Sequence, residues 1–186
     1  MGYKYLMANY ITNASNKIDC NQLLKDISYL PGDRRIIDPN FFNMNDSKFE
    51  NIGDLWNRAG YDTNSIEWFN YYSGVDFITD YSIKFGNLFN ADPIKVWISK
   101  ILPGKCFPRH WDADYKEDQY HGKQLVRYQM FLKDYEFGHV FILEDTPIVG
   151  YKMGDVWNWR NHLVWHGGAN IGFTPKYIFN FLGSTK

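Results

Sequence analysis

The stretch LVRYQMFL, residues 125–132, alternates between two sets of side chains. Successive side chains of a β-strand point to opposite faces, so this period of two predicts a strand. One face would carry Val126, Tyr128, Met130 and Leu132, and the other Arg127, Gln129 and Phe131. An arginine is unusual on a buried strand face, and two alternatives stay open. Arg127 either binds a carboxylate from a buried face or lies on an exposed one.

Similar strand-like segments surround this one after residue 92. They cover residues 94–102, 106–109, 139–143, 148–152, 156–159 and 177–182. Turn signals separate them, at Pro103-Gly104, Gly138, Asp145-Thr146-Pro147, Gly154-Asp155 and Gly167-Gly168. Many short strands at spacings of about 8–12 residues predict a sandwich or a barrel, and a jelly roll is the leading candidate.

In the N-terminal half, apolar residues recur at helical spacing rather than in the alternation of a strand. Apolar residues recur at helical spacing in residues 18–30, and residues 51–59 and 76–89 are further predicted helices. We therefore predict a mainly β chain (α+β overall) that forms a single domain. Residues 1–92 would form a mixed helical cap, residues 93–186 the jelly-roll core, and the helices would cover one sheet.

Composition excludes several classes of function. The chain has 186 residues, is 45% hydrophobic and 19% aromatic, and has a formal net charge of −1. This charge gives no case for a nucleic-acid partner or a polybasic membrane protein. The first residues lack a signal peptide's apolar run, and no segment is long enough to cross a bilayer. We expect a soluble, cytoplasmic protein, and its oligomeric state stays open.

The motif that carries chemistry is His110-Trp111-Asp112. On a strand, a histidine and a carboxylate two residues apart point the same way. A second histidine downstream would complete a two-histidine, one-carboxylate face, which leaves open positions on the metal and suits non-heme Fe(II) oxygenases. The second histidine is either His162 or His166. We favour His166, because Gly167-Gly168 after it would let backbone pass close to a metal and its ligands.

Lys176 follows His166 by ten residues and begins the last predicted strand. An ordinary lysine at a strand end is one interpretation. If its ammonium is buried instead, it needs a partner, which an acidic co-substrate would supply. Hydrogen bonds to charged groups contribute about 1.5–3 kcal/mol, enough to set the affinity for such a co-substrate.

Residues 94–183 resemble the Fe(II)/2-oxoglutarate-dependent dioxygenases, and among them the aspartyl/asparaginyl β-hydroxylase-like branch with its small bacterial and phage relatives. The residues that carry the resemblance are His110-Trp111-Asp112, Arg127-Tyr128-Gln129, Gly154-Asp155-Val156-Trp157, His166 and Lys176. That branch proper lacks the ligand carboxylate that Asp112 supplies here, and it has a histidine where this chain has Gln129.

The resemblance implies a double-stranded β-helix with Fe(II) bound by His110, Asp112 and His166. It further implies O2 and 2-oxoglutarate as co-substrates, with ascorbate as an optional reductant. Lys176 stands where the family usually has an arginine that contacts the distal carboxylate of 2-oxoglutarate. Arg127 stands where the branch has a second co-substrate-binding arginine, and Gln129 is expected beside it.

The implied function is hydroxylation of a C–H bond in an amino acid, a peptide side chain or a small metabolite. One alternative is a non-catalytic, cupin-like binding or structural module in which the histidines serve packing. Another is a zinc hydrolase with the same three ligands, which would need a general base near the metal. Glu144 is the only nearby glutamate with strand context.

Overall fold

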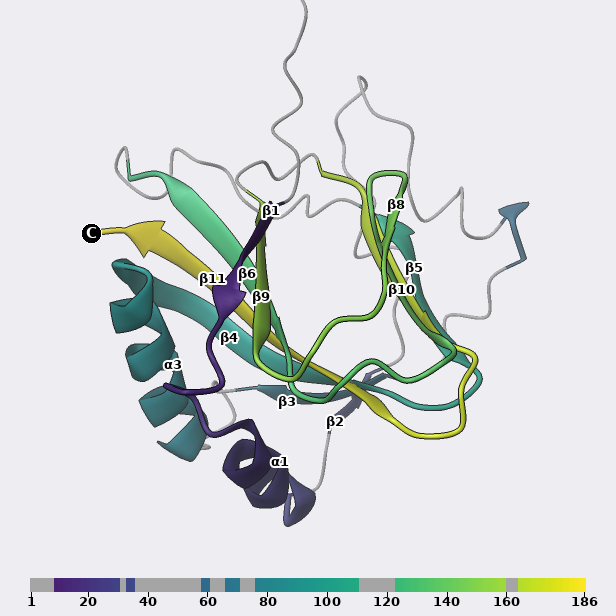
Figure 1. Ribbon diagram of the computed structural model, residues 1–186, viewed down its shortest axis with the longest axis horizontal. Coiled ribbons are helices and arrows are strands. Elements are labelled where there is room, and N and C mark those ends of the chain that lie inside the picture. The colour runs from purple at the N-terminus through teal and green to yellow at the C-terminus, as the bar shows by residue number, and fades with distance from the viewer. Residues whose placement is uncertain are drawn as a thin grey trace, which may run out of the picture.

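The structure is a computed structural model that describes residues 9–30, 33–35, 58–60, 66–70, 76–110, 123–159 and 164–186. Two antiparallel sheets face each other, and the helices α1 (Cys20–Ser28) and α3 (Asp76–Leu88) lie on the outer side of the larger sheet (Figure 1). This arrangement is the double-stranded β-helix, and it confirms the predicted fold class.

Within the described residues, the larger sheet has seven strands and the smaller sheet has four. The order in the larger sheet is β1 (Asn9–Asn13), β9 (Asp155–Trp159), β6 (Leu125–Phe131), β11 (Lys176–Thr185), β4 (Ala91–Ile101), β3 (Ile66–Asn70) and β2 (Asp33–Arg35). The order in the smaller sheet is β5 (Lys105–His110), β10 (His166–Asn170), β7 (His139–Leu143) and β8 (Thr146–Ile148).

Each helix forms because its apolar residues share one face. Helix α1 begins after Asp19, whose carboxylate accepts a hydrogen bond from the backbone N–H of Gln22 at 2.9 Å. In α3, the buried residues Ile78, Tyr81 and Phe85 recur at helical spacing. These stripes anchor both helices to the outer face of the seven-stranded sheet.

The alternation of residues 125–132 divides the core into two clusters. Val126, Met130 and Leu132 belong to the cluster that includes the buried faces of α1 and α3. Phe131 belongs to the second cluster, which includes residues from both sheets and so lies between them. Arg127 and Gln129 share the face of Phe131 and are 7% and 8% exposed. The interpretation of this face as exposed was therefore wrong.

One turn signal of the sequence was also wrong, because Gly167-Gly168 does not turn the chain but lies inside β10. The signal at Asp145-Thr146-Pro147 does mark the turn between β7 and β8, although Thr146 and Pro147 already belong to β8. Gly167 is glycine because the neighbouring strand passes very close: a Cβ at this position would be 3.1 Å from Arg109 Cα and from Arg109 N. Pro147 is tolerated because β8 is an edge strand, where a missing N–H costs no ladder bond. In the described part of the chain, no helix is long and apolar enough to span a membrane.

The two glycines of β10 offer a matched test of this packing. We expect Gly167→Ala to push β5 away from β10 and to lower the free energy of unfolding by about 1–3 kcal/mol. A Cβ at Gly168 would make ordinary contacts, of 3.4 Å with Val140 O and 3.5 Å with Ile101 Cδ1. Gly168→Ala should therefore cost less, which chemical denaturation of both variants will measure. Equal losses would contradict the close approach of β5 to β10.

Candidate metal and anion site

His110 and His166 lie opposite each other on the antiparallel strands β5 and β10. Their ring centroids are 4.2 Å apart, and the two residues are 4% and 5% exposed. The indole of Trp159 on the facing sheet lies 5.1 Å from the His166 ring. The fold therefore brings two predicted ligands, 56 residues apart in sequence, into contact at one end of the interior.

A bulge in β5 sets the direction of His110. Between two paired positions, β10 advances two residues while β5 advances three, from Phe107 to His110. In a regular strand, residues three apart face opposite sides, but here the rings of Phe107 and His110 are 4.2 Å apart. Pro108 lies within this irregularity on an edge strand, where proline is tolerated. The bulge turns the His110 ring toward the interior.

The same backbone contact fixes the proton on both rings. His110 Nδ1 lies 2.8 Å from the carbonyl oxygen of Pro108, and His166 Nδ1 lies 3.0 Å from that of Val164. A carbonyl oxygen can only accept, so each Nδ1 is the donor. In the neutral ring, Nε2 then keeps its lone pair, which is the state that binds a metal.

The third predicted ligand, Asp112, and the alternative histidine, His162, lie outside the described residues. Among the residues that the structure does describe, no three His, Cys, Asp or Glu side chains are grouped closely enough to hold a metal. Two of the three predicted ligands thus lie side by side, and Asp112 follows two residues after His110, the last residue of β5.

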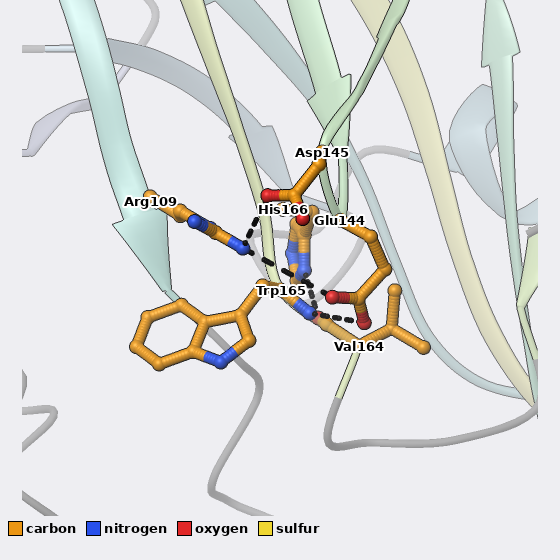
Figure 2. Close-up of polar contacts among 6 residues, drawn as sticks. All are labelled: Arg109, Glu144, Asp145, Val164, Trp165 and His166. Atoms are coloured by element: carbon orange, nitrogen blue, oxygen red, sulfur yellow. Dashed lines mark hydrogen bonds and ion pairs between the residues drawn. The ribbon is translucent and has the colours of Figure 1, made fainter. Parts of the chain in front are cut away.

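A cluster on the outer face of the smaller sheet braces the residues that precede both histidines (Figure 2). The backbone N–H of Glu144 donates to Trp165 O at 2.6 Å, and the Trp165 N–H donates to Glu144 Oε1 at 3.2 Å. Arg109 donates to Asp145 Oδ1 at 3.3 Å, and its guanidinium lies 5.2 Å from the centre of the Trp165 ring. Trp165, immediately before His166, is therefore tied to the turn between β7 and β8.

The Glu144 carboxylate thus makes structural contacts. Its backbone φ of 52° is rare for a residue with a side chain, and its carboxylate faces Trp165 N and Arg109 rather than standing free as a base. Glu144 was the only candidate base for a zinc hydrolase, and this geometry does not favour that alternative.

Lys176 reaches from the first position of β11 into the interior and is 1% exposed. Its ammonium donates to Val140 O at 2.6 Å and lies 5.2 Å from the centre of the Phe141 ring and 5.7 Å from that of Phe131. No carboxylate of the described residues pairs with it, and burial lowers its pKa to about 7. The side chain is therefore a buried amine that no carboxylate of the described chain accompanies, not an ordinary lysine at a strand end.

Tyr151 borders the same space and was not predicted from the sequence. Its ring stacks on Phe131 with centroids 3.7 Å apart, and the Lys176 ammonium lies 5.9 Å from its centre. Its hydroxyl is buried and has no hydrogen-bond partner within the described ranges. Burial raises the pKa of this hydroxyl, so it keeps its proton and can donate. No spacing in the sequence distinguishes it among fourteen tyrosines.

Comparison with known proteins places the fold. No family model matches the sequence, and no curated protein matches it. Among solved structures, the viral collagen prolyl hydroxylase vCPH from Paramecium Bursaria Chlorella virus-1, in its 2OG complex, is similar with a TM-score of 0.56 and 17% identity, over 99% of this chain and 98% of that one. An oxidoreductase of the 2OG-Fe(II) oxygenase family from Burkholderia pseudomallei has a TM-score of 0.53 and 12% identity, over 88% and 77%. The chain therefore has the fold of the 2OG-Fe(II) oxygenases.

The histidine pair predicts metal-dependent stability. We expect Mn(II) to raise the unfolding midpoint of the wild-type chain, because a ligand at about 100 times its Kd stabilises by about 2.7 kcal/mol. His110→Ala and His166→Ala should each abolish this rise in a thermal melt. His139→Ala is the control: His139 is buried, but its Nε2 contacts Thr174 O at 2.9 Å, so the loss of stability should leave the Mn(II) effect intact. A full Mn(II) effect in His166→Ala would exclude His166 as a ligand.

The contacts between Glu144 and Trp165 predict different Mn(II) affinities for two Glu144 variants. Glu144→Gln keeps an acceptor for the Trp165 N–H, whereas Glu144→Ala removes it and frees the start of β10. We expect the alanine variant to bind Mn(II) about fivefold more weakly, which corresponds to one net hydrogen bond of roughly 1 kcal/mol. Titration followed by Mn(II) electron paramagnetic resonance measures both affinities. If the two variants bind equally well, the brace does not position His166.

Proposed function

We propose that this chain is an Fe(II)/2-oxoglutarate-dependent dioxygenase that hydroxylates a C–H bond of an amino acid, a peptide side chain or a small metabolite. The observation that carries the proposal is the buried ammonium of Lys176, which no carboxylate of the described residues contacts, in the interior that also contains the two imidazoles. A buried cation without a counter-ion is costly and implies an anionic ligand.

The donor set fits the metal. The two imidazoles, each with Nδ1 against a backbone carbonyl, together with the carboxylate of Asp112, would form the three-ligand face that suits Fe(II) and leaves positions open. Fe(II) with 2-oxoglutarate and O2 supplies oxidative decarboxylation of the co-substrate to succinate and carbon dioxide, with transfer of one oxygen atom to the substrate. The protein's share is to hold the reactants in place and to exclude water.

Lys176 and Tyr151 would together bind the distal carboxylate of 2-oxoglutarate. The ammonium has donors left after its bond to Val140 O, and the protonated Tyr151 hydroxyl adds another. An aromatic wall joins this end to the metal end: Phe141 contacts Lys176 at 5.2 Å and Trp159 at 6.4 Å, and Trp159 contacts His166. These rings would line the aliphatic middle of the co-substrate and keep water out.

Arg127 is the second buried cation of this face of the larger sheet. It pairs in register with Trp159 and Leu182, six residues along β11 from Lys176, or about 20 Å of strand. Trp159, its neighbour in register on β9, contacts the His166 ring at 5.1 Å. We therefore assign Arg127 to the metal end, where it would bind a carboxylate of the substrate or the metal-proximal end of the co-substrate.

The aspartyl/asparaginyl β-hydroxylase-like branch stays a prediction that rests on Arg127-Tyr128-Gln129 and the strand after Gly154. The use of ascorbate as an added reductant is likewise a prediction. A non-catalytic binding module remains the alternative, and turnover separates the two. An oxygenase incubated with Fe(II), ascorbate and 2-oxoglutarate forms some succinate even without substrate, whereas a binding module forms none.

Replacement of Lys176 by methionine tests two effects separately: the cost of burying the ammonium and the loss of 2-oxoglutarate binding. Since its pKa is about 7 when folded and near 10.5 when unfolded, the unfolded chain binds more protons between these values. The free energy of unfolding therefore rises with pH across that window, and the full cost of burial applies below pH 7. We expect Lys176→Met to be more stable than wild type at pH 7, with an advantage that shrinks toward pH 10. Denaturation at several pH values will measure this.

In the same variant, 2-oxoglutarate should no longer raise the unfolding midpoint of the Mn(II)-loaded protein, although Mn(II) alone should still do so. Lys25→Met, on the exposed face of α1, is the matched control and should keep both effects. Retention of the 2-oxoglutarate effect in Lys176→Met would show that this lysine does not bind the co-substrate.

A further inference from the structure

A row of polar side chains crosses the inner face of the larger sheet. Asn180 on β11, Gln129 on β6 and Trp157 on β9 are paired in register on adjacent strands. The residues two positions away, Ile178 and Phe131, belong to the cluster between the sheets, so the row faces the same interior. Polar groups in such a place need partners.

The hydrogen bonds of Asn180 fix the direction of the Gln129 amide. Asn180 Nδ2 donates to Ser99 Oγ at 3.0 Å, to Ile178 O at 3.1 Å and to Trp97 O at 3.4 Å. Its Oδ1 is therefore the acceptor that faces Gln129, whose Nε2 donates to it at 2.8 Å. The remaining atom of the Gln129 amide, Oε1, is an oxygen that can only accept.

Gln129 Oε1 is buried and has no hydrogen-bond partner among the described residues, and the same holds for the indole N–H groups of Trp157 and Trp159. Each such group costs about 1–3 kcal/mol when it stays unsatisfied. Of these three groups, Gln129 Oε1 is the acceptor and the two indoles are donors. 2-Oxoglutarate offers only carboxylate and ketone oxygens at neutral pH, so it can satisfy the indoles but not Gln129.

We propose that Gln129 and Trp157 bind an amide group of the substrate, with the amide N–H donating to Gln129 Oε1 and the carbonyl oxygen accepting from Trp157 Nε1. An amide carries both complements side by side, whereas an acid, ester or ketone lacks the donor. The proposal deepens the proposed function, because it names the substrate class and assigns Gln129 to the substrate rather than to the co-substrate.

The test compares two small molecules of equal size that differ in the donor. The full chain, labelled with ¹⁵N at tryptophan and loaded with Zn(II) and 2-oxoglutarate, is titrated with N-methylacetamide and with methyl acetate. The indole signal of Trp157, assigned through Trp157→Phe, should shift saturably with at least fivefold tighter binding of the amide. The titration is repeated without Zn(II) and 2-oxoglutarate, so the preference is measured even if the co-substrate does not bind.

Two variants test whether Gln129 causes the preference for the amide over the ester. Gln129→Leu should remove it by making the two affinities equal, whereas Ser99→Ala, which changes only the far side of Asn180, should keep it. The proposal is overturned if wild type binds both compounds equally, if neither shifts the Trp157 signal saturably, or if the preference survives in Gln129→Leu. The wild-type comparison decides the matter even if Gln129→Leu does not fold. Loss of 2-oxoglutarate binding with a retained amide preference would reject the oxygenase and keep the amide site.

Discussion

The pairing of β5 with β10 is the constraint on which the site depends. It places His110 opposite His166, and the bulge after Phe107 aims the first ring inward. The backbone then sets the chemistry of both rings, because the carbonyl two residues earlier accepts the Nδ1 proton in each case. Gly167 permits the close approach of these strands, and the brace at Glu144 holds the start of β10 from outside.

The interior between the sheets contains charged and polar groups that no described residue satisfies. Lys176 is a desolvated cation whose bond to Val140 O leaves donors unused, and the Tyr151 hydroxyl beside it is unsatisfied within the described chain. Gln129 presents an acceptor farther along the same face. On the proposals above, the cation would bind an acidic co-substrate and the amide oxygen a substrate that can donate. Each of them lowers stability in the empty protein and favours binding.

Much of the fold was predictable from the sequence, because alternation of residues 125–132 and the helical stripe of α3 report burial directly. Strand β10 was missed because Gly167-Gly168 is a usual turn signal, and only the three-dimensional approach of β5 explains it. The spacing from His166 to Lys176 singled out two residues that the fold buries. The burial of Lys176 could not be predicted, since lysines at strand ends are ordinarily solvated. Tyr151 was missed because stacking on Phe131, not sequence spacing, brings it there.

The most direct measurement of the central claim is a crystal structure of the chain grown with Mn(II) and 2-oxoglutarate, with the ion located by its anomalous signal. The account predicts one ion within bonding distance of Nε2 of both His110 and His166 and of the Asp112 carboxylate, with the distal carboxylate of 2-oxoglutarate on Lys176. An ion bound elsewhere, or imidazoles whose Nε2 atoms point away from it, would contradict the account.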